Sequence, residues 1–364
     1  MISTTWASAP GRVNLIGEHT DYNGGYVLPT PIPQRTMVEL RIRSDDRVRA
    51  WSREYGSWQE YRLGEERRRG DWLDYVMGCT YALRTAGHEL GGVELRIASD
   101  VPVGSGLSSS AALEVAVLRA IRAAFALTLD DVELALLGQR AENELVGAPV
   151  GAMDQLCASL GEPGVALFID TRSLALRRIP LPADIDLLVI DSGVAHDHAS
   201  GDYRTRRAEC EEAARRLGVS LLRELGPEDL PRIASLPAPL DRRVRHVVSE
   251  NQRVLAAVAA IERGERRTLG RLFADSHASM RDDYEVSIPA TDTLVAIAAA
   301  DPDVFAARLT GGGFGGSIVA LADTGAGDEA ARRIAARYLE QTGNPAQVLV
   351  AAPIGLSLAN PARQ

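Results

Sequence analysis

The chain has 364 residues, of which 46% are hydrophobic and 24% are charged, the composition of an ordinary globular protein. A chain of this length usually forms more than one hydrophobic core, so two domains are expected. The net charge of −9 argues against nucleic acid as a main partner. No apolar run approaches the roughly 18 residues that a membrane-spanning helix needs, so no membrane association is predicted.

Residues 1–6 lack the basic and apolar regions of a secretory signal peptide. The three cysteines, Cys79, Cys157 and Cys210, are widely spaced and odd in number, which fits neither a disulfide framework nor a metal site. Both features predict a protein of the reducing cytoplasm.

Residues 9–29 form the most informative segment of the chain. Polar and charged side chains alternate there with glycines, while Val13, Leu15 and Ile16 favour burial. Short strand pieces that hold a polar loop fit this pattern. Such loops recognise polyhydroxylated or charged ligands.

The next segment, residues 36–50, alternates apolar and polar side chains, which predicts a half-exposed strand. Asp45 and Asp46 indicate a turn, after which residues 48–51 are expected to pair back onto that strand. A helix is then predicted from Asp71 to near Gly87.

Further elements follow from apolar periodicity and from glycine and proline positions. They are strands at residues 93–97, 187–192, 317–321 and 347–351, and helices at residues 111–125, 129–145, 153–160, 203–217, 244–263, 269–284 and 328–342. Strands and helices come in short groups rather than in strict alternation, which favours an α+β fold. We expect a seam near residues 170–185, with domains at residues 1–178 and 179–364.

Residues 102–112 place small side chains at the start of a predicted helix. Backbone amides there lack partners and the helix dipole adds positive charge, so the loop favours phosphate. One of the hydroxyls of Ser108, Ser109 and Ser110 could also reach a magnesium ion. An ordinary helix N-cap with a flexible lead-in is the alternative. This loop has neither the Gly-Lys-Ser/Thr of a P-loop nor a spaced Gly-x-Gly-x-x-Gly motif, so a dinucleotide-binding fold is not expected.

A second glycine cluster covers residues 311–316, with Phe314 as its only large side chain. A tight turn is one interpretation. So many glycines cost conformational entropy, however, and close approach of the backbone to the first loop or to a ligand explains them better.

Residues 11–24, 102–112 and 309–316 resemble the three signature motifs of the GHMP small-molecule kinases, and the first resembles the galactokinase signature without a break. Residues 151–155, 202–207 and 285–289 also resemble galactokinase segments, so the resemblance extends from about residue 9 to residue 321, which is most of the chain. It implies two α+β lobes with the active site in the cleft between them. The implied reaction is transfer of the γ-phosphoryl group of ATP to the anomeric hydroxyl of galactose, with Mg²⁺.

The resemblance also implies residue roles. By position, Asp154 corresponds to the aspartate beside the sugar O1 and is the candidate general base, although it could instead be an ordinary first-turn helix residue. Arg12 would hold Asp154 ionised and stabilise the migrating charge. The sequence leaves open whether Asp154 abstracts the proton or only orients the hydroxyl.

For the sugar, the resemblance assigns Glu18 and His19 to O6 and Asp21 to O3 and O4. Gly151 would offer backbone to the sugar, and Tyr203 would contact O4. Carboxylates suit this task because they accept hydrogen bonds from neighbouring hydroxyls.

For ATP, the implied phosphate-binding residues are Gly104, Ser105, Gly106, Leu107, Ser108, Ser109 and Ser110. Trp72 and Tyr75 resemble residues near the adenine pocket, although both could be core. Glu142 lies twelve residues before Asp154, as does the magnesium-binding glutamate of the family, and Ser110 is its expected partner at the ion.

Gly201 and Asp202 depart from the family pattern, as do the residues at positions 196–198. These changes border Tyr203, so a GHMP kinase for another sugar, such as N-acetylgalactosamine, arabinose or a uronic acid, stays open. A non-catalytic sugar sensor is a further alternative. The retained Arg12, Glu142 and Asp154 argue against the sensor. A monomer or weak homodimer is expected.

Overall fold

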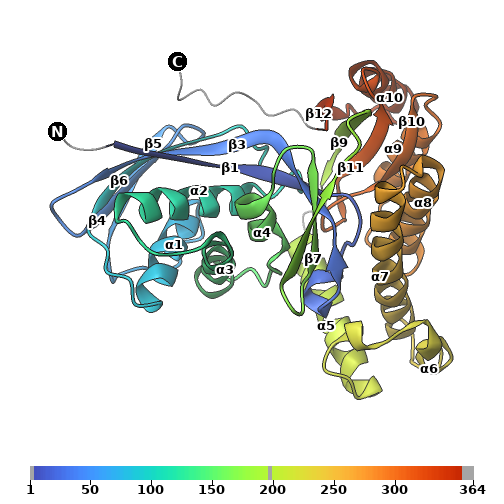
Figure 1. Cartoon of the computed structure of the whole chain (residues 1–364), viewed down its shortest axis with the longest axis horizontal. Helices are drawn as coiled ribbons and strands as arrows, with labels where there is room; N and C mark the ends of the chain where they lie inside the picture. The colour runs from blue at the N-terminus through green and yellow to red at the C-terminus, as the bar shows by residue number, and fades with distance from the viewer. Residues whose placement is uncertain (1–3, 196–198, 355–364) are drawn as a thin grey trace.

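The computed structural model describes residues 4–195 and 199–354, and it consists of two α+β portions that meet near the middle of the molecule (Figure 1). The first portion is built on a five-stranded sheet in the order β1-β3-β6-β4-β5. Its strands are β1 (Thr4–Asn14), β3 (Pro29–Ile42), β6 (Val93–Ser99), β4 (Arg47–Ser52) and β5 (Ser57–Arg62).

Four helices cover one face of this sheet (Figure 1). They are α1 (Leu73–Thr85), α2 (Ser109–Ala124), α3 (Asp131–Ala141) and α4 (Met153–Leu160). Side chains alternate between the two faces of a strand, so Val38 and Leu40 of β3 both point into the core that these helices bury. A three-stranded sheet of β2 (Tyr26–Val27), β7 (Val165–Asp170) and β8 (Ala175–Pro180) packs against α4.

The second portion holds a four-stranded antiparallel sheet in the order β10-β11-β9-β12, with helices on both faces. Its strands are β10 (Val304–Leu309), β11 (Gly315–Asp323), β9 (Ile185–Ala195) and β12 (Gln347–Pro353). Helices α9 (Pro289–Ala299) and α10 (Gly327–Thr342) share a cluster with Ile318, whereas α7 (Leu240–Glu262) and α8 (Arg266–Asp282) share one with the next residue, Val319. Successive side chains of β11 therefore point to opposite faces of the sheet, and each face packs against its own pair of helices.

Helix α5 (Ala199–Leu217) and the short helix α6 (Leu230–Ile233) extend away from the sheets at the lower right of Figure 1. The 3₁₀ turns η3 (Leu222–Glu224) and η4 (Pro227–Asp229) lie between them. Their apolar residues join α7 in a separate cluster. This extension carries Tyr203 toward the junction of the two portions.

The predicted pairing of residues 48–51 with the strand before them is wrong. β4 pairs with β5 and, in parallel, with β6, while β6 lies next to β3. A local alternation predicts a strand but does not specify its partner. The sequence analysis also missed the strands β5, β7, β8 and β10 and the helices α6 and α9. β8 is mostly exposed and α9 is apolar nearly throughout, so neither shows the expected periodicity.

One apolar cluster crosses the predicted domain boundary, since Leu15 and Leu28 belong to it together with Phe273 and Val319. The division at residues 178 and 179 falls within β8 and stays a prediction. Within the described parts of the chain, no helix is both long and apolar enough to cross a membrane.

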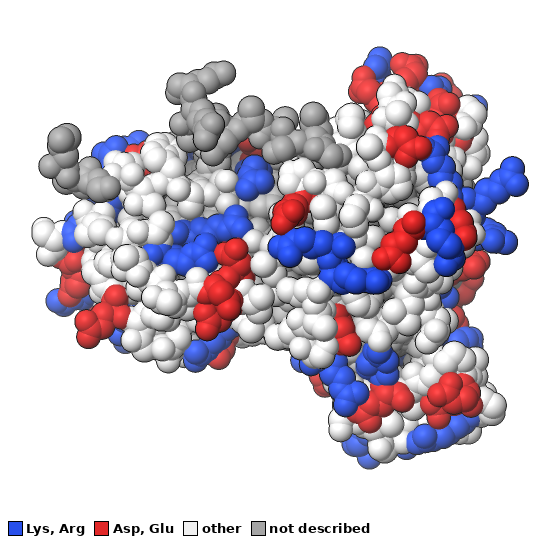
Figure 2. Space-filling model, viewed as in Figure 1, with Lys and Arg blue, Asp and Glu red and all other residues white. Residues whose placement is uncertain are grey.

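All 40 basic residues of the chain are arginine. Figure 2 shows them interspersed with carboxylates on the face in view. Many form exposed ion pairs, such as Arg47 with Glu60 at 2.7 Å, which contribute little to stability individually.

Candidate active site

Asp154, in the first turn of α4, is the point where three segments of the chain meet. Arg12 at the end of β1 donates from Nε to Oδ1 and from Nη2 to Oδ2 of Asp154, both at 2.8 Å. The hydroxyl of Ser108 donates to the same carboxylate. Because Arg12 is 5% exposed and the contact is bidentate, this is a strong, directional ion pair.

The loop before α2, residues 102–108 and here called the phosphate loop after the sequence prediction, has backbone amides without partners among the described residues. Arg12 Nη1 donates to the carbonyl of Gly106 at 2.6 Å, which fixes the loop against β1. Gly104 and Gly106 have φ of 79° and 77°, in the left-handed region that favours glycine. Toward the described residues, the backbone amides of residues 104–108 donate no hydrogen bond, so they are free to bind a ligand.

The alternative that this loop is an ordinary N-cap is wrong. Ser108 occupies the N-cap position with φ of 57°, but its side chain makes no cap hydrogen bond and instead reaches Asp154. Ser105 donates its hydroxyl to the Pro102 carbonyl, and Leu107 is buried in the core. Both therefore offer only backbone to a phosphate.

The second glycine cluster packs directly against this loop, as the sequence analysis preferred. A Cβ on Gly311 would lie 3.5 Å from the Cα of Gly106. The Ser317 hydroxyl donates to the Ser105 carbonyl at 2.8 Å. The cluster thus joins the C-terminal sheet to the phosphate loop.

A cavity lies beside the Arg12–Asp154 pair. The residues that line it are Arg12, Glu18, His19, Asp21, Val150, Gly151, Met153, Asp154, Tyr203, Gly311 and Gly312. Every residue that the sequence analysis assigned to sugar binding or catalysis therefore lines a single cavity. The residues at positions 196–198, where the sequence departs from the family pattern, lie outside the described residues.

Asp21, in the 3₁₀ turn η1 (Asp21–Asn23), lies against Gly151, and both line this cavity. Burial, and then the negative charge of Asp154, raise the pKa of Asp21 to about 6. A Cβ on Gly151 would lie 2.1 Å from Asp21 Oδ2, so a larger residue at position 151 would displace the Asp21 side chain.

Glu18 is almost fully buried at the far end of the cavity. Its Oε1 accepts hydrogen bonds from the Gly311 amide at 3.0 Å and from the Thr310 hydroxyl at 3.2 Å. Its Oε2 lies 2.5 Å from Nη2 of Arg308, which is 0% exposed. Sequence reasoning missed Arg308, although an arginine in the apolar strand β10 was a usable signal.

His19 also lines the cavity, with φ of 62°. Its Nδ1 lies 2.9 Å from the Tyr22 hydroxyl and its Nε2 lies 3.2 Å from the Gly312 carbonyl. Burial lowers the pKa of His19 to about 3, so the ring is neutral at physiological pH.

Glu142 lies in the π-helical segment η2 (Glu142–Val146) that extends α3. Burial, and then the charge of Asp154, raise the pKa of Glu142 to about 7, while hydrogen bonds from Ser110 and Gln155 oppose this rise. Gln155 Nε2 donates to Glu142 at 2.9 Å and also to Glu114 at 3.0 Å. Sequence reasoning missed both Gln155 and Glu114.

No group of three or more His, Cys, Asp or Glu side chains in the described ranges is arranged to hold a metal. Glu142 and Ser110 nevertheless fit Mg²⁺, which is often held by one or two carboxylates together with substrate phosphates. Burial disfavours the charge of Glu142, and a divalent cation would compensate for that burial.

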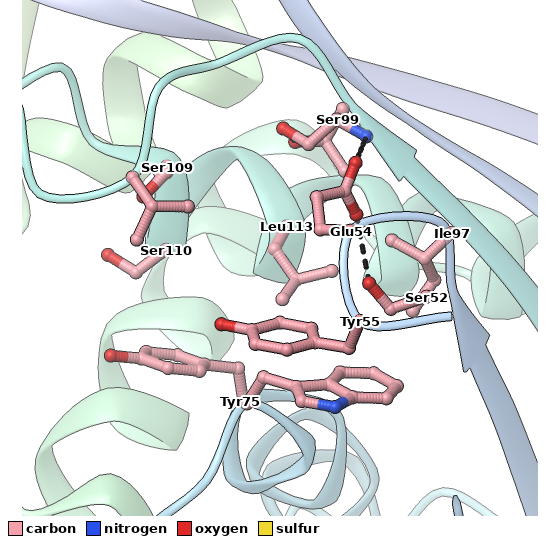
Figure 3. A pocket seen from close by; sticks show the side chains of 12 residues that line it. Ser52, Glu54, Tyr55, Tyr75, Ile97, Ser99, Ser109, Ser110 and Leu113 are labelled. Carbon is pink, nitrogen blue, oxygen red and sulfur yellow. Dashed lines mark hydrogen bonds between the residues drawn. The ribbon is translucent and has the colours of Figure 1, made fainter. Parts of the chain in front are cut away.

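A second cavity lies beside the start of α2, where Ser109 and Ser110 line it (Figure 3). Tyr55 and Trp72 stack there with ring centroids 5.8 Å apart and planes 6° from parallel. Tyr75, Ser109 and Ser110 also line it. Trp72 and Tyr75 therefore border a cavity, as the resemblance implied, whereas Tyr55 was not predicted.

Comparison with known proteins agrees with this geometry. The family model described as the galactokinase galactose-binding signature matches residues 3–42. Those described as the GHMP kinases N-terminal and C-terminal domains match residues 74–162 and 257–340.

Two curated relatives are galactokinases at 45% identity. The protein of Roseiflexus sp. (strain RS-1) matches over 94% of this chain and 89% of its own length. That of Streptomyces coelicolor matches over 90% of this chain and 87% of its own length.

The solved structure of Lactococcus lactis galactokinase complexed with galactose superposes with a TM-score of 0.92 at 35% identity, over 98% of this chain and 94% of that one. Methanococcus jannaschii mevalonate kinase, at 18% identity and a TM-score of 0.70 over 95% of this chain and 98% of that one, shows the shared fold alone. The chain belongs to the galactokinase family of the GHMP kinases.

Proposed function

We propose that this protein transfers the γ-phosphoryl group of ATP to the anomeric hydroxyl of D-galactose. The observation that carries the proposal is the position of the Arg12–Asp154 pair. The pair lines the cavity that holds the predicted sugar-binding residues, here called the sugar cavity. It also contacts the phosphate loop, because Arg12 donates to the Gly106 carbonyl and Asp154 accepts from Ser108. A sugar hydroxyl at Asp154 would therefore face a phosphate held by the loop.

Galactose would fill the cavity beside this pair. Asp21 would accept hydrogen bonds from O3 and O4, Tyr203 would contact O4, and the Gly151 backbone would lie along the ring. Glu18 and His19 would lie near O6. The galactose-binding signature in the same segment supports this sugar, as does the galactose complex of the similar L. lactis galactokinase.

ATP would span the loop and the second cavity. The free amides of residues 104–108 would bind its phosphates, with the dipole of α2 adding positive charge. The adenine would lie against the stacked Tyr55 and Trp72, near Tyr75. Ser109 and Ser110 follow the loop directly and also line this cavity, so a nucleoside bound there would lie next to phosphates bound at the loop.

Ser110 and Glu142 are the residues that would hold Mg²⁺. When bound, the ion neutralises charge on the β- and γ-phosphates. The chain has no lysine, so the protein cation at the transferring group would be an arginine, and Arg12 contacts the loop that would hold the phosphate. Its bidentate contact with Asp154 fixes the guanidinium before substrates arrive.

In the proposed step, the O1 hydroxyl attacks the γ-phosphorus and its proton passes to Asp154. A bond forms between O1 and phosphorus, and the bond from the γ-phosphorus to the β,γ-bridging oxygen breaks. ADP leaves with the electron pair of that bond. Arg12 stabilises the charge that develops on the transferring oxygens, so catalysis rests on positioning and electrostatics.

An enzyme-linked assay of ADP release across a panel of monosaccharides tests this proposal. With ATP and Mg²⁺, we expect the highest kcat/KM for D-galactose over N-acetylgalactosamine, arabinose, galacturonic acid and glucose. A higher value for another sugar would reassign the substrate. Sugar binding without ADP release from any of them would favour the sensor.

A further inference from the structure

Behind the sugar cavity, four side chains from three segments form a continuous hydrogen-bonded relay. His19 Nδ1 lies 2.9 Å from the Tyr22 hydroxyl, which lies 2.8 Å from the Tyr284 hydroxyl. That hydroxyl lies 3.1 Å from the sulfur of Cys210 on α5. At the other side of the ring, His19 Nε2 lies 3.2 Å from the carbonyl of Gly312. We call His19, Tyr22, Tyr284 and Cys210 the relay.

The tautomer of His19 follows from its two partners. A carbonyl only accepts hydrogen bonds, so Nε2 must carry the proton that it shares with Gly312. The buried ring is neutral, as its low pKa indicates, and a neutral imidazole has one protonated nitrogen. Nδ1 is therefore an acceptor, and the Tyr22 hydroxyl donates to it.

The remaining protons are then fixed one after another. Tyr22 has only one hydroxyl proton and gives it to His19, so Tyr284 must donate to Tyr22. Tyr284 has then used its own proton, so the Cys210 thiol donates to Tyr284. Burial raises the pKa of Cys210 to about 11, which keeps that thiol protonated. Every hydrogen bond in the relay thus points toward His19.

The relay is held rigidly. Tyr284 is fully buried, and its ring lies between those of His19 and His246 at centroid distances of 4.7 and 4.5 Å. Cys210 is 1% exposed. The Asn23 side chain donates to the His19 carbonyl at 2.8 Å, which supports the left-handed φ of that residue. The ring of His19 therefore has little freedom to rotate.

We propose that Tyr22, Tyr284 and Cys210 are positioning residues that hold His19 as the Nε2–H tautomer, so that His19 and Gly312 together recognise one sugar hydroxyl. Both residues line the cavity. A hydroxyl beside this pair accepts from Nε2–H as a second acceptor, shared with the Gly312 carbonyl, and donates to the remaining lone pair of that carbonyl, whereas the opposite tautomer would present two acceptors. The identity of that hydroxyl as O6 rests on the proposed function, but the tautomer does not.

Nitrogen NMR of the full chain labelled in its histidines tests the relay without any substrate. His19 is assigned from the signal that disappears in His19→Gln. We expect a protonated Nε2 and a bare, hydrogen-bonded Nδ1. In Tyr22→Phe the Nδ1 signal should shift toward that of a nitrogen without a hydrogen bond. A proton found on Nδ1 in the wild-type protein would overturn the proposal.

Calorimetric binding of galactose and 6-deoxygalactose tests the consequence. Tyr22→Phe should raise the Kd for galactose about fivefold, which corresponds to one net hydrogen bond. The same variant should raise the Kd for 6-deoxygalactose less than twofold. Tyr284→Phe should raise the Kd for galactose less than Tyr22→Phe does. Cys210→Ser keeps a hydrogen-bond donor, so its Kd for galactose should match that of the wild-type protein. Tyr26→Phe is the matched control, because the ring of Tyr26 packs on Phe168 outside the relay.

Equal weakening of both sugars by Tyr22→Phe would show a general packing role and would overturn the proposal. If galactose does not bind to the wild-type protein, the proposed function fails. The NMR result still decides the tautomer in that case, so the two failures are distinguishable.

Discussion

At the scale of single residues, the carboxylates of Asp154 and Asp21 line the same cavity but have different neighbours. Asp154 receives a bidentate arginine and a serine hydroxyl, whereas Asp21 forms no ion pair with the described residues and is affected by burial and then by the charge of Asp154. The pKa of Asp21 therefore rises to about 6, within reach of ordinary buffers. This gives the proposed sugar contact a pH dependence.

We predict that galactose binding weakens as the pH falls through about 6. Only the ionised carboxylate of Asp21 accepts hydrogen bonds with both oxygens, and its ionised fraction drops about tenfold between pH 7 and pH 5 for a pKa near 6. The KM for galactose at saturating ATP and Mg²⁺ should rise by a similar factor. A profile that is flat across this window would contradict the assignment.

The same shift has a consequence for stability. The folded pKa of Asp21 lies above its ordinary value of 3.8, so the folded state binds the proton more tightly and stability falls as the pH rises from about 4 to about 6. Asp21→Asn removes this loss. We expect it to abolish sugar phosphorylation yet stabilise the protein at pH 7 by about 1 kcal/mol, allowing for partial exposure of the side chain. Urea unfolding at pH 4 and pH 7 measures the difference, and a variant that is less stable at pH 7 would count against it.

Glu142 permits a second test at this scale. Removing its negative charge should raise the Mg²⁺ concentration for half-maximal activity by about tenfold or more, since Mg²⁺ prefers carboxylate oxygen. The variant is Glu142→Gln, assayed by Mg²⁺ titration at fixed ATP. Glu144→Gln is the control, because Glu144 lies in the same π-helical segment but is exposed and paired with Arg140. Equal effects of the two variants would remove Glu142 from the metal site.

The role of Ser108 could not be predicted from the sequence. Its place among three serines at a helix start indicated phosphate binding, whereas its hydroxyl donates to Asp154, which lies in another helix. The same holds for Arg308, because its partner Glu18 is distant in the chain. Motifs place residues in a common site, but the contacts between motifs depend on the fold.

At the scale of elements, the glycine cluster is where the C-terminal sheet meets the phosphate loop. Gly313 has φ of 78°, and a Cβ there would lie 2.4 Å from the carbonyl of Val286. Gly316 has a similar φ of 76° but open space around it. Substitution at Gly316 would therefore introduce backbone strain alone, whereas substitution at Gly313 would introduce both strain and a steric clash.

We predict that Gly313→Ala destabilises the protein by several kcal/mol, because strain and a backbone clash add together. Gly316→Ala should cost only the strain of a left-handed residue, about 1–2 kcal/mol. Chemical unfolding of both variants at pH 7 measures the difference. If both variants lose the same free energy of unfolding, the clash with Val286 is relieved by a small shift. Close approach of the backbone would then not explain the glycine at position 313.

Most helices and strands could be predicted, since their apolar periodicity is a local property. The helix predicted at residues 153–160 coincides with α4, for example. The prediction of strand partners was wrong. β4 forms a strand as expected, but it pairs with β6, which lies between β4 and β3 in the sheet. The partner of a strand depends on chain segments that the alternation does not describe.

At the scale of the whole molecule, a buried cluster of charges joins the signature segment to the C-terminal portion. Arg308 of β10 contacts Glu18, lies 3.9 Å from Glu250 of α7 and donates to the Leu15 carbonyl at 2.9 Å. Burial alone would raise the pKa of Glu250. The positive charges of Arg253, His246 and Arg308 outweigh it, and the pKa falls to about 2.

Removing Arg308 should therefore destabilise the whole fold. Arg308→Met leaves the buried carboxylate of Glu18 without its ion-pair partner, while Glu250 keeps Arg253, and the loss of a buried partner typically costs about 3–5 kcal/mol. Since the folded pKa of Glu250 lies below its ordinary value of 4.5, the wild-type protein should lose stability as the pH falls from about 4.5 toward 2. Urea unfolding at pH 7 and pH 3 tests both statements. The control is Arg332→Met, whose exposed pair with Asp328 should contribute less than about 1 kcal/mol.

The central claim is that Asp154 and Arg12 direct a phosphoryl group onto the anomeric oxygen of galactose. The most direct measurement is phosphorus NMR of the product formed from D-galactose, ATP and Mg²⁺, with the Asp154→Asn variant run beside the wild-type protein. We predict a single sugar phosphate whose phosphorus couples to the anomeric proton, and a loss of at least about a hundredfold in rate in the variant. A phosphate on any other hydroxyl, or near-normal turnover by Asp154→Asn, would contradict the claim.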